Sequence, residues 1–247
     1  MTSTVFKQLY RSALADSERL DEDSVLLDIG AKDGKIASAL ADAIGCRAIV
    51  LDIDFDEDAT DRDCDLIRGD GTEIPLPDDS VDAIVSNMVF EHVPDEEALI
   101  ADTARVLSDD GVFISICPNR AWPGDGHGYP LGMPWLPESI GGRVARPYDQ
   151  KYERGEGWYR EAYHPVWSIT VRRELSRYFE TVEYRSGDLL DLDLDASNGK
   201  QRLLETFAEP LELAFSSRLG RRLVEAVFPT PVYVSKHPKR GRRRPNG

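Results

Sequence analysis

The stretch Val25-Leu-Leu-Asp-Ile-Gly30-Ala-Lys-Asp-Gly34 decides how this chain folds. Its first five residues are apolar apart from one aspartate, which predicts a buried strand. The glycines that follow predict a tight turn, and residues 35–43 have the apolar spacing of a helix. Such a turn lets the backbone approach a ligand closely, and the helix N-terminus behind it favours negative charge.

Short apolar runs alternate with amphipathic stretches along the rest of the chain. Strands are expected at residues 25–29, 48–53, 66–68, 81–86, 112–117, 181–185 and 231–235. Helices are expected at residues 5–20, 35–43, 96–107, 170–178 (capped by Ser168 or Thr170) and 203–227 (broken around Pro210 and Gly220). This alternation predicts an α/β fold with a mostly parallel sheet and helices on both faces.

The composition is strongly acidic, with 45 Asp and Glu against 30 Lys and Arg and a net charge of −15. Asp contributes 27 residues and Lys only 7, which predicts a protein adapted to molar salt, where counterions screen the self-repulsion. An acidic body repels phosphate backbones and so disfavours nucleic acid as a partner. Residues 236–247 carry six cationic and no acidic side chains, and we expect them to form a disordered basic tail.

Length and cysteine usage indicate one intracellular domain. The 247 residues are 41% hydrophobic, which predicts a single folded domain over residues 1–235. Three widely spaced cysteines form no CxxC pair and no even-numbered disulfide framework, as in a reducing cytoplasm. The chain has no apolar run long enough to span a membrane and no signal-peptide core. We therefore expect a soluble, cytoplasmic protein.

The glycine spacing excludes a dinucleotide fingerprint, because a G-x-G-x-x-G pattern that starts at Gly30 meets Lys32 and Lys35 at its other two positions. The stretch instead resembles motif I of the class I S-adenosylmethionine methyltransferases, an acid-x-G-x-G-x-G pattern. Asp28, Gly30 and Gly34 match this pattern. Lys32 replaces the middle glycine, and the resemblance implies that its ammonium lies near the methionine carboxylate of the cofactor.

Three further segments match that family in order and spacing. Ile49-Val-Leu-Asp52 ends with the carboxylate that the family uses for ribose. GDGTEIPLPDDSVD at residues 69–82 is similar to the family's adenine-binding segment, and VSNMVFEHV at residues 85–93 resembles the LEHV segment of the type 11 methyltransferases. Together these matches cover about residues 24–118. They imply a Rossmann-like class I methyltransferase fold of seven strands, with an antiparallel last strand.

The resemblance also implies a cofactor and the residues that bind it. The cofactor is S-adenosylmethionine. Asp70 would accept from the adenine amino group, Gly71 would donate to the ring, and Ile53 would pack against adenine opposite Ile74. The implied cofactor site comprises Asp28, Gly30, Lys32, Gly34, Asp52, Ile53, Asp70, Gly71 and Asn87.

Catalytic candidates come from the histidines. Methyl transfer from a sulfonium depends mainly on positioning, and a general base matters only for acceptors such as hydroxyls. His127, in a glycine-rich segment, is the first candidate for that base, with His92 and His164 as further candidates that could instead shape or pack the pocket. No residues have zinc-ligand spacing, and the acidic residues 52–65 have Glu57 where a calcium loop needs glycine. No metal site is predicted.

The segment at residues 119–167 is expected to form the lid over the acceptor, as in the type 11 family. Residues 122–167 contain all four tryptophans and five of the nine tyrosines. Aromatic faces suit sugar rings or quinoid acceptors, and arginines suit carboxylates or phosphates, although these aromatics could simply pack an insertion. The substrate-binding candidates are Trp122, Tyr129, Trp135, Arg143, Tyr163 and Trp167.

These features predict methyl transfer to an oxygen of a small-molecule or lipid-linked glycan acceptor. A quinone-type metabolite is an alternative acceptor. Because Lys32 departs from the family pattern, a cofactor-binding module without catalysis stays open, and only the basic tail supports nucleic acid as an acceptor. Residues 203–247 suit a peripheral membrane contact, although the helix there could simply cover the sheet.

Overall fold

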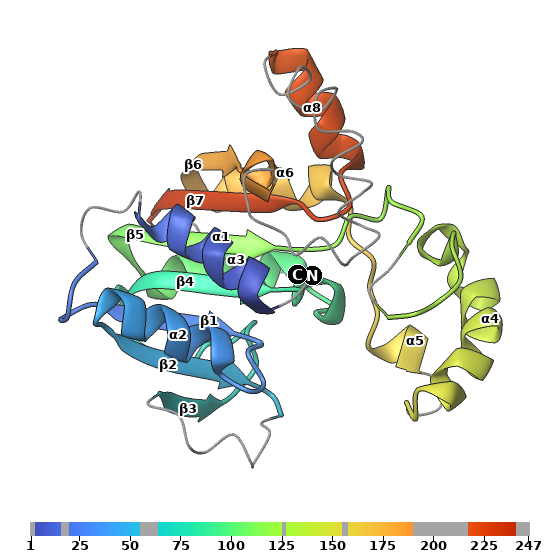
Figure 1. Cartoon of the computed structure of the whole chain (residues 1–247), viewed down its shortest axis with the longest axis horizontal. Helices are drawn as coiled ribbons and strands as arrows, with labels where there is room; N and C mark the ends of the chain where they lie inside the picture. The colour runs from blue at the N-terminus through green and yellow to red at the C-terminus, as the bar shows by residue number, and fades with distance from the viewer. Residues whose placement is uncertain are drawn as a thin grey trace.

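A computed structural model describes residues 3–15, 20–54, 64–124, 127–154, 158–189 and 217–240. Its centre is a seven-stranded sheet with the order β3-β2-β1-β4-β5-β7-β6 (Figure 1). The strands are β1 (Val25–Ile29), β2 (Arg47–Asp52), β3 (Asp65–Arg68), β4 (Val81–Asn87), β5 (Leu107–Ile116), β6 (Phe179–Tyr184) and β7 (Val232–Pro238). Strands β1 to β5 pair in parallel, whereas β7 is antiparallel to both β5 and β6. The predicted sheet and its antiparallel last strand are confirmed.

Helices cover both faces of this sheet, as predicted. The helices and 3-10 turns are α1 (Ser3–Ala15), α2 (Lys35–Ile44), η2 (Phe90–His92), α3 (Glu96–Val106), η3 (Met133–Trp135), α4 (Glu138–Lys151), α5 (Trp158–Glu161), α6 (Ser168–Tyr178), η4 (Ser186–Leu189) and α8 (Arg218–Val227). Leu9 of α1 and Leu40 of α2 pack on one face, and Leu99 of α3 and Leu175 of α6 pack on the other. Within the described ranges, no helix has both the length and the apolar run needed to cross a membrane.

The segment between β5 and α6 forms a lobe beside the sheet, built from η3, α4 and α5 (Figure 1). Its own small core comprises Tyr129, Met133, Ala145, Tyr159 and Tyr163. Gly141 of α4 permits this packing, because a Cβ there would lie 2.7 Å from the Tyr159 ring. The sequence predicts an insertion here but not α4, which has few apolar positions and contains Pro147.

Two helix starts differ from the prediction. Helix α8 begins after Ser217, whose hydroxyl accepts the backbone N–H of Gly220 over 2.9 Å. The helix therefore begins close to the predicted break around Gly220, but a break at Gly220 itself is wrong, because this glycine lies in the first turn. Trp167 occupies the N-cap position of α6, which has no side-chain cap, and the Ser168 hydroxyl instead donates to the carbonyl of Glu225 over 2.8 Å. A capping role for Ser168 or Thr170 is also wrong.

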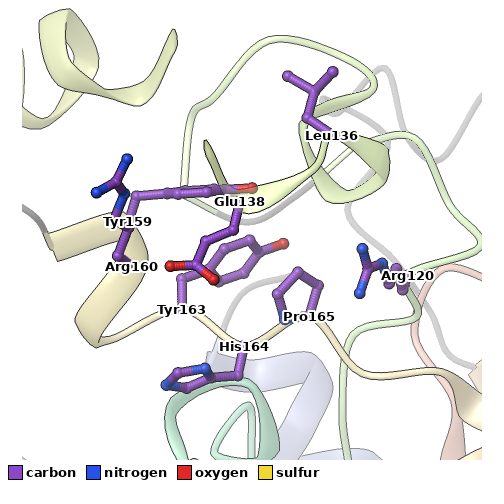
Figure 2. Close-up of a pocket in the computed structure, with 8 residues that line it drawn as sticks. All are labelled: Arg120, Leu136, Glu138, Tyr159, Arg160, Tyr163, His164 and Pro165. Atoms are coloured by element: carbon purple, nitrogen blue, oxygen red, sulfur yellow. The ribbon is translucent and has the colours of Figure 1, made fainter. Parts of the chain in front are cut away.

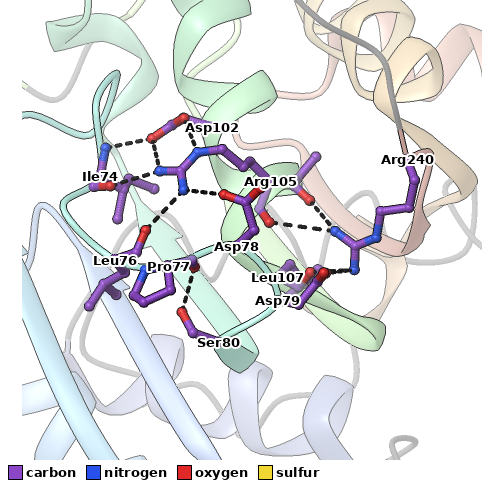
Figure 3. A network of polar contacts seen from close by, with 11 residues as sticks. Ile74, Leu76, Pro77, Asp78, Asp79, Ser80, Asp102, Arg105, Leu107 and Arg240 are labelled. Carbon is purple, nitrogen blue, oxygen red and sulfur yellow. Dashed lines mark hydrogen bonds and ion pairs between the residues drawn. The ribbon is translucent and has the colours of Figure 1, made fainter.

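The basic end of the chain is ordered further than predicted. Strand β7 continues to Pro238, and the guanidinium of Arg240 donates to the carbonyl of Leu107 over 2.9 Å (Figure 3). Arg240 also pairs with the carboxylates of Asp109 and Asp79. A disordered tail that starts at residue 236 is therefore wrong, because strand pairing and these bonds hold the chain as far as residue 240. The part of the predicted helix over residues 203–216, with its break around Pro210, and the rest of the predicted tail, residues 241–247, lie outside the described residues.

Candidate functional site

The carboxyl ends of β1 and β4 meet where the strand order reverses, with β2 and β3 on one side and β5 on the other. Ligands of open α/β sheets bind in the crevice at such a point. Gly30 follows β1 and Val89 follows β4, and the two loops touch closely: a Cβ on Gly30 would lie 2.4 Å from Cγ2 of Val89. Its φ of 74° is also left-handed, so this position requires glycine.

The loop after β1 contains three left-handed residues. The φ angles are 74° at Gly30, 42° at Lys32 and 61° at Gly34. Lys32 alone of these has a side chain, so its backbone is strained. The Asp52 carboxylate, at the end of β2, accepts the backbone N–H of Lys32 over 2.8 Å and holds this conformation. Lys32 therefore follows the backbone course that glycine would take.

Asp52 and Asp70 follow the ends of neighbouring strands β2 and β3, as the sequence predicts. The Asp52 carboxylate accepts the backbone N–H groups of Lys32 and Asp54 over 2.8 and 2.9 Å. The Asp70 carboxylate accepts that of Thr72 over 2.8 Å. An ionised carboxylate has about four acceptor sites. Each side chain therefore keeps the capacity to accept further hydrogen bonds from a ligand.

A network around Arg105 fixes the loop that follows Asp70 (Figure 3). The guanidinium donates to the carboxylate of Asp102 over 2.7 and 2.8 Å. It also donates to the carbonyls of Ile74 and Leu76 over 2.8 and 2.9 Å. The Asp102 carboxylate in turn accepts the backbone N–H of Ile74 over 2.5 Å. The loop is thereby tied to α3 and held beside the end of β3.

The remaining residues of the implied cofactor site fit a nucleoside. Ile53 is 71% exposed and offers an open apolar face beside Asp52. Gly71 packs tightly, because a Cβ there would lie 2.9 Å from Cδ1 of Leu99. The amide oxygen of Asn87 is buried and has no hydrogen-bond partner among the residues that the structure describes. Such an oxygen favours a bound group that supplies a donor.

Asp28 lies beneath this loop and not on its surface. Only 2% of it is exposed, and the backbone N–H of Ala37, in the first turn of α2, reaches its carboxylate. Burial, together with smaller contributions from the charges of Asp33 and Asp52, raises the pKa of Asp28 to about 8. Asp28 therefore positions the loop and the start of α2.

The structure brings the three catalytic candidates together at η2, just after β4. The Nε2 atoms of His92 and His127 lie 3.4 Å apart. The Nδ1 atom of His92 lies 2.5 Å from the carbonyl oxygen of Ala162. The backbone N–H of His164 donates to the carbonyl of Glu91 over 2.6 Å. The prediction did not include Glu91, although an acidic side chain in the apolar run before His92 could have signalled it.

Burial controls the charges of this group. It lowers the pKa of His127 to about 4, with smaller contributions from the charges of His92 and Arg154, and it also lowers the pKa of His92. Burial raises the pKa of Glu91 to about 7. Both imidazoles are therefore neutral at pH 7. An effective general base has a pKa near the operating pH, so the low pKa of His127 makes it a weak base for a hydroxyl.

A cavity of about 230 Å³ lies in the insertion, and His164 is part of its wall (Figure 2). Its walls are Arg120, Leu136, Glu138, Tyr159, Arg160, Tyr163, His164 and Pro165. Two arginines, two tyrosines and a carboxylate make it polar, with aromatic walls. Its charged groups can bind an anionic or hydroxyl-rich molecule, and it adjoins His127, whose ring centroid lies 4.9 Å from that of Tyr163.

Of the predicted substrate residues, Tyr163 lines this cavity. Tyr129 is instead buried in the core of the insertion, where its hydroxyl donates to Asp149. The exposed residues Trp122, Trp135, Arg143 and Trp167 do not line the cavity. The indole of Trp135 is bonded to the backbone of the insertion, because its Nε1 donates to the carbonyl of Arg120 over 2.8 Å. Contacts of these exposed residues with an acceptor stay a prediction.

Comparison with known proteins agrees with this geometry. Residues 27–115 match the family described as methyltransferase domain. A probable S-adenosylmethionine-dependent methyltransferase of Mycolicibacterium smegmatis is 36% identical over 110 residues, which cover 43% of this chain and 42% of that protein. Sarcosine/dimethylglycine N-methyltransferase of Halorhodospira halochloris is 32% identical over 115 residues, 42% of this chain and 41% of that protein. The chain thus spans about two fifths of the length of these relatives.

Solved structures share the fold over most of the chain. A putative methyltransferase of Haloferax volcanii, in complex with the Trm112 methyltransferase activator, has a TM-score of 0.54 and 20% identity over 93% of this chain and 89% of that chain. Geranyl diphosphate methyltransferase in complex with S-adenosylmethionine has a TM-score of 0.54 and 12% identity over 94% of this chain and 85% of that chain. Residues 27–115 are therefore similar to a methyltransferase domain, and the fold of the chain is that of the class I methyltransferases.

Proposed function

We propose that this chain transfers a methyl group from S-adenosylmethionine to an oxygen of a small-molecule or lipid-linked glycan acceptor. The cofactor supplies a methyl group activated on a sulfonium. The observation that carries the proposal is a polar cavity in the insertion that reaches η2 through His164, whose backbone N–H donates to the carbonyl of Glu91 just after β4. Asp52 and Asp70 bind the nucleoside of the cofactor. The ammonium of Lys32 contributes positive charge beside the methionine carboxylate of the cofactor.

The neutral histidines support an oxygen acceptor. Because Nδ1 of His92 faces the Ala162 carbonyl, that nitrogen carries the hydrogen, and Nε2 has a lone pair that can accept a hydrogen bond from a hydroxyl. His127 lies next to His92 and orients the same group, and His164 lines the cavity behind them. This arrangement holds an acceptor oxygen at the carboxyl end of β4.

The cavity walls support an acceptor that also carries an anionic or hydroxyl-rich group. The guanidinium groups of Arg120 and Arg160 suit a carboxylate or phosphate, and Tyr159 and Tyr163 supply ring faces and hydroxyls. A sugar hydroxyl and a uronic acid carboxylate both fit this chemistry. A quinone-type acceptor uses the aromatic walls but leaves the arginines without a role, so we favour the glycan.

Incubation of the full chain in high salt with methyl-labelled S-adenosylmethionine and fractionated cell extract tests this proposal. Label in a small-molecule, lipid or glycan fraction supports it. Label in RNA or DNA would replace it with a nucleic-acid methyltransferase. Tight cofactor binding with no labelled product from any fraction would favour the binding module without catalysis. Cytoplasmic location and salt adaptation stay predictions.

A peripheral contact with an anionic lipid surface belongs to the same proposal. Helix α8 exposes Leu219, Leu223 and Val227 on one side, and it also carries the exposed Arg218 and Arg221. Exposed apolar and cationic side chains on one helix suit a lipid–water interface. Val224 of the helix and Phe228, its C-cap, pack against sheet residues such as Val232 and Val234, so this end of the helix also has the expected packing role. Replacing Leu223 by Asp should reduce the fraction of protein that co-sediments with anionic vesicles. Equal co-sedimentation of this variant and the wild type would rule out the membrane contact.

A further inference from the structure

Three potential metal-binding side chains, Glu91, His92 and His127, gather beside the acceptor cavity. Each offers one ligand atom, and these atoms all lie within 4.8 Å of one another. Glu91 and His92 belong to η2, whereas His127 comes from the insertion. The sequence predicts no metal site because residue spacing does not show that the fold brings His127 to the other two.

The two imidazoles are spaced like ligands of one ion. Their Nε2 atoms lie 3.4 Å apart, and two nitrogen ligands of a tetrahedral Zn²⁺ lie about 3.3 Å apart. The Nδ1 atom of His92 lies 2.5 Å from the carbonyl of Ala162, which can only accept a hydrogen bond. A neutral His92 therefore presents its Nε2 lone pair toward His127. A backbone carbonyl that fixes a ring in this way is the usual outer partner of a metal-binding histidine.

Glu91 supplies the negative charge. It is 2% exposed, and its Oε2 atom is buried with no hydrogen-bond partner among the described parts of the chain. A buried carboxylate oxygen without a partner is costly, and a cation beside it removes that cost. This buried oxygen is an observation independent of the histidine spacing, and it points to the same ligand.

We propose that Glu91, His92 and His127 bind one divalent transition-metal ion, for which Zn²⁺ is the matching probe. Two imidazole nitrogens and one carboxylate oxygen are an established ligand set for such ions. Three protein ligands leave at least one coordination position for another molecule. Tyr163 and His164 connect the group to the acceptor cavity, since the Tyr163 ring contacts His127 and the His164 backbone binds Glu91.

The role of the ion rests on the proposed function, although its binding does not. With the ion bound, the Nε2 lone pair of His92 is a metal ligand, so the acceptor hydroxyl would occupy the open position of the ion in place of the hydrogen bond to Nε2. It would there release its proton to water at a lower pH than in solution. Zn²⁺ lowers the pKa of bound water to about 7 in the same way. His127 would then not have to accept the proton of the acceptor hydroxyl, and its neutral nitrogen would serve as a metal ligand. The inference narrows the acceptor to one with a hydroxyl or carboxylate oxygen.

Calorimetric titration of Zn²⁺ into the chelator-treated full chain in molar KCl tests this site. We expect one Zn²⁺ per chain, and Co²⁺ in its place should give visible absorption. Loss of an outer partner already costs about 10–100-fold in metal affinity. His127→Asn and Glu91→Gln should therefore each weaken Zn²⁺ binding by at least about 100-fold. His237→Asn, which removes an exposed histidine on β7, is the matched control and should bind like the wild type.

Two results would overturn the proposal. One is the absence of stoichiometric Zn²⁺ binding to the wild type, which would leave the two rings joined by a hydrogen bond alone. The other is equal affinity in His127→Asn and His237→Asn, which would assign the binding to surface acids. Circular dichroism checks that each variant is folded, and His92→Asn replaces any that is not. Titration with S-adenosylhomocysteine on the same samples separates the two claims, because a failed metal site leaves cofactor binding intact.

Discussion

The backbone N–H of Lys32 donates to the carboxylate of Asp52 over 2.8 Å, joining the loop after β1 to the end of β2. This bond holds a lysine in the left-handed conformation, with φ at 42°. One carboxylate thus shapes the loop and also lies where a ribose would bind. The departure from the glycine pattern is therefore accommodated by the backbone.

Replacing Lys32 by Gly should relieve the strained backbone. Left-handed backbone costs a residue with a side chain about 1–2 kcal/mol, and the extra freedom of glycine in the unfolded chain offsets about half of this. We expect the free energy of unfolding to rise by up to about 1 kcal/mol, measured by urea titration. Affinity for S-adenosylmethionine should fall if the ammonium binds its carboxylate. Unchanged affinity would remove that role, and lower stability would contradict the strain.

Asp28 should make stability depend on pH. Its pKa is near 3.9 in an unfolded chain and about 8 when folded, because burial favours the protonated form. Between these two pKa values the folded state holds one more proton than the unfolded state. The contribution of protonated Asp28 to stability is therefore full below about pH 4 and is lost as the pH rises through about 8. The slope approaches about 1.4 kcal/mol per pH unit.

The Asp28→Asn variant tests this by urea unfolding between about pH 5 and 8. The variant should gain stability relative to the wild type as the pH rises. Asp23→Asn, an exposed acid before β1, should show no such trend. If the free energy of unfolding changes with pH in the same way for Asp28→Asn and the wild type, Asp28 is ionised in its buried position.

Arg240 should stabilise the fold although it lies beyond the last strand. Its guanidinium donates to the carbonyls of Leu107 and Ala104 over 2.9 and 3.2 Å and pairs with Asp109 at the surface. Since these ion pairs are largely exposed, we expect Arg240→Ala to cost about 1 kcal/mol of unfolding free energy. A chain that ends at residue 240 should unfold like the full chain. A chain that ends at residue 235 should be less stable than the full chain. Equal free energies of unfolding would contradict a stabilising role for residues 236–240.

The acidic composition should make the thermal midpoint depend on salt. With a net charge of −15, self-repulsion weakens the fold in dilute buffer, where the screening length is about 30 Å at 0.01 M ionic strength. A scanning measurement in about 2 M KCl should give a higher midpoint than one in dilute buffer. Equal midpoints would remove the inferred salt adaptation.

The sheet was predictable from the sequence because its strands are continuous apolar runs. Val25–Ile29 and Val81–Asn87 are buried along nearly their whole length, so hydrophobic pattern and position agree. The end of β7 at Pro238 was not predictable, because its basic residues pair through the backbone. Helix α4 was also missed, since tertiary packing such as that of Gly141 against Tyr159 supports it.

The cofactor side of the site was predictable for a similar reason. Asp52 is the last residue of β2 and Asp70 lies two residues after β3, and each carboxylate accepts a backbone N–H from two residues further along the chain. The acceptor side depends on how the insertion folds back on η2. The contact between His92 and His127 joins residues 35 positions apart, and the Arg154 guanidinium holds the carbonyl of His127 over 2.7 Å. No local pattern encodes that approach.

Cofactor binding at the ends of β2 and β3 is most directly tested by calorimetric titration of S-adenosylhomocysteine into the full chain at about 2 M KCl. The account predicts one site per chain. It also predicts affinity about 10–100-fold lower in Asp52→Asn, because a charge-assisted hydrogen bond contributes about 1.5–3 kcal/mol. Asp54→Asn, two residues away and exposed, should bind like the wild type. No heat with the wild type, or equal binding by Asp52→Asn and Asp54→Asn, would contradict it.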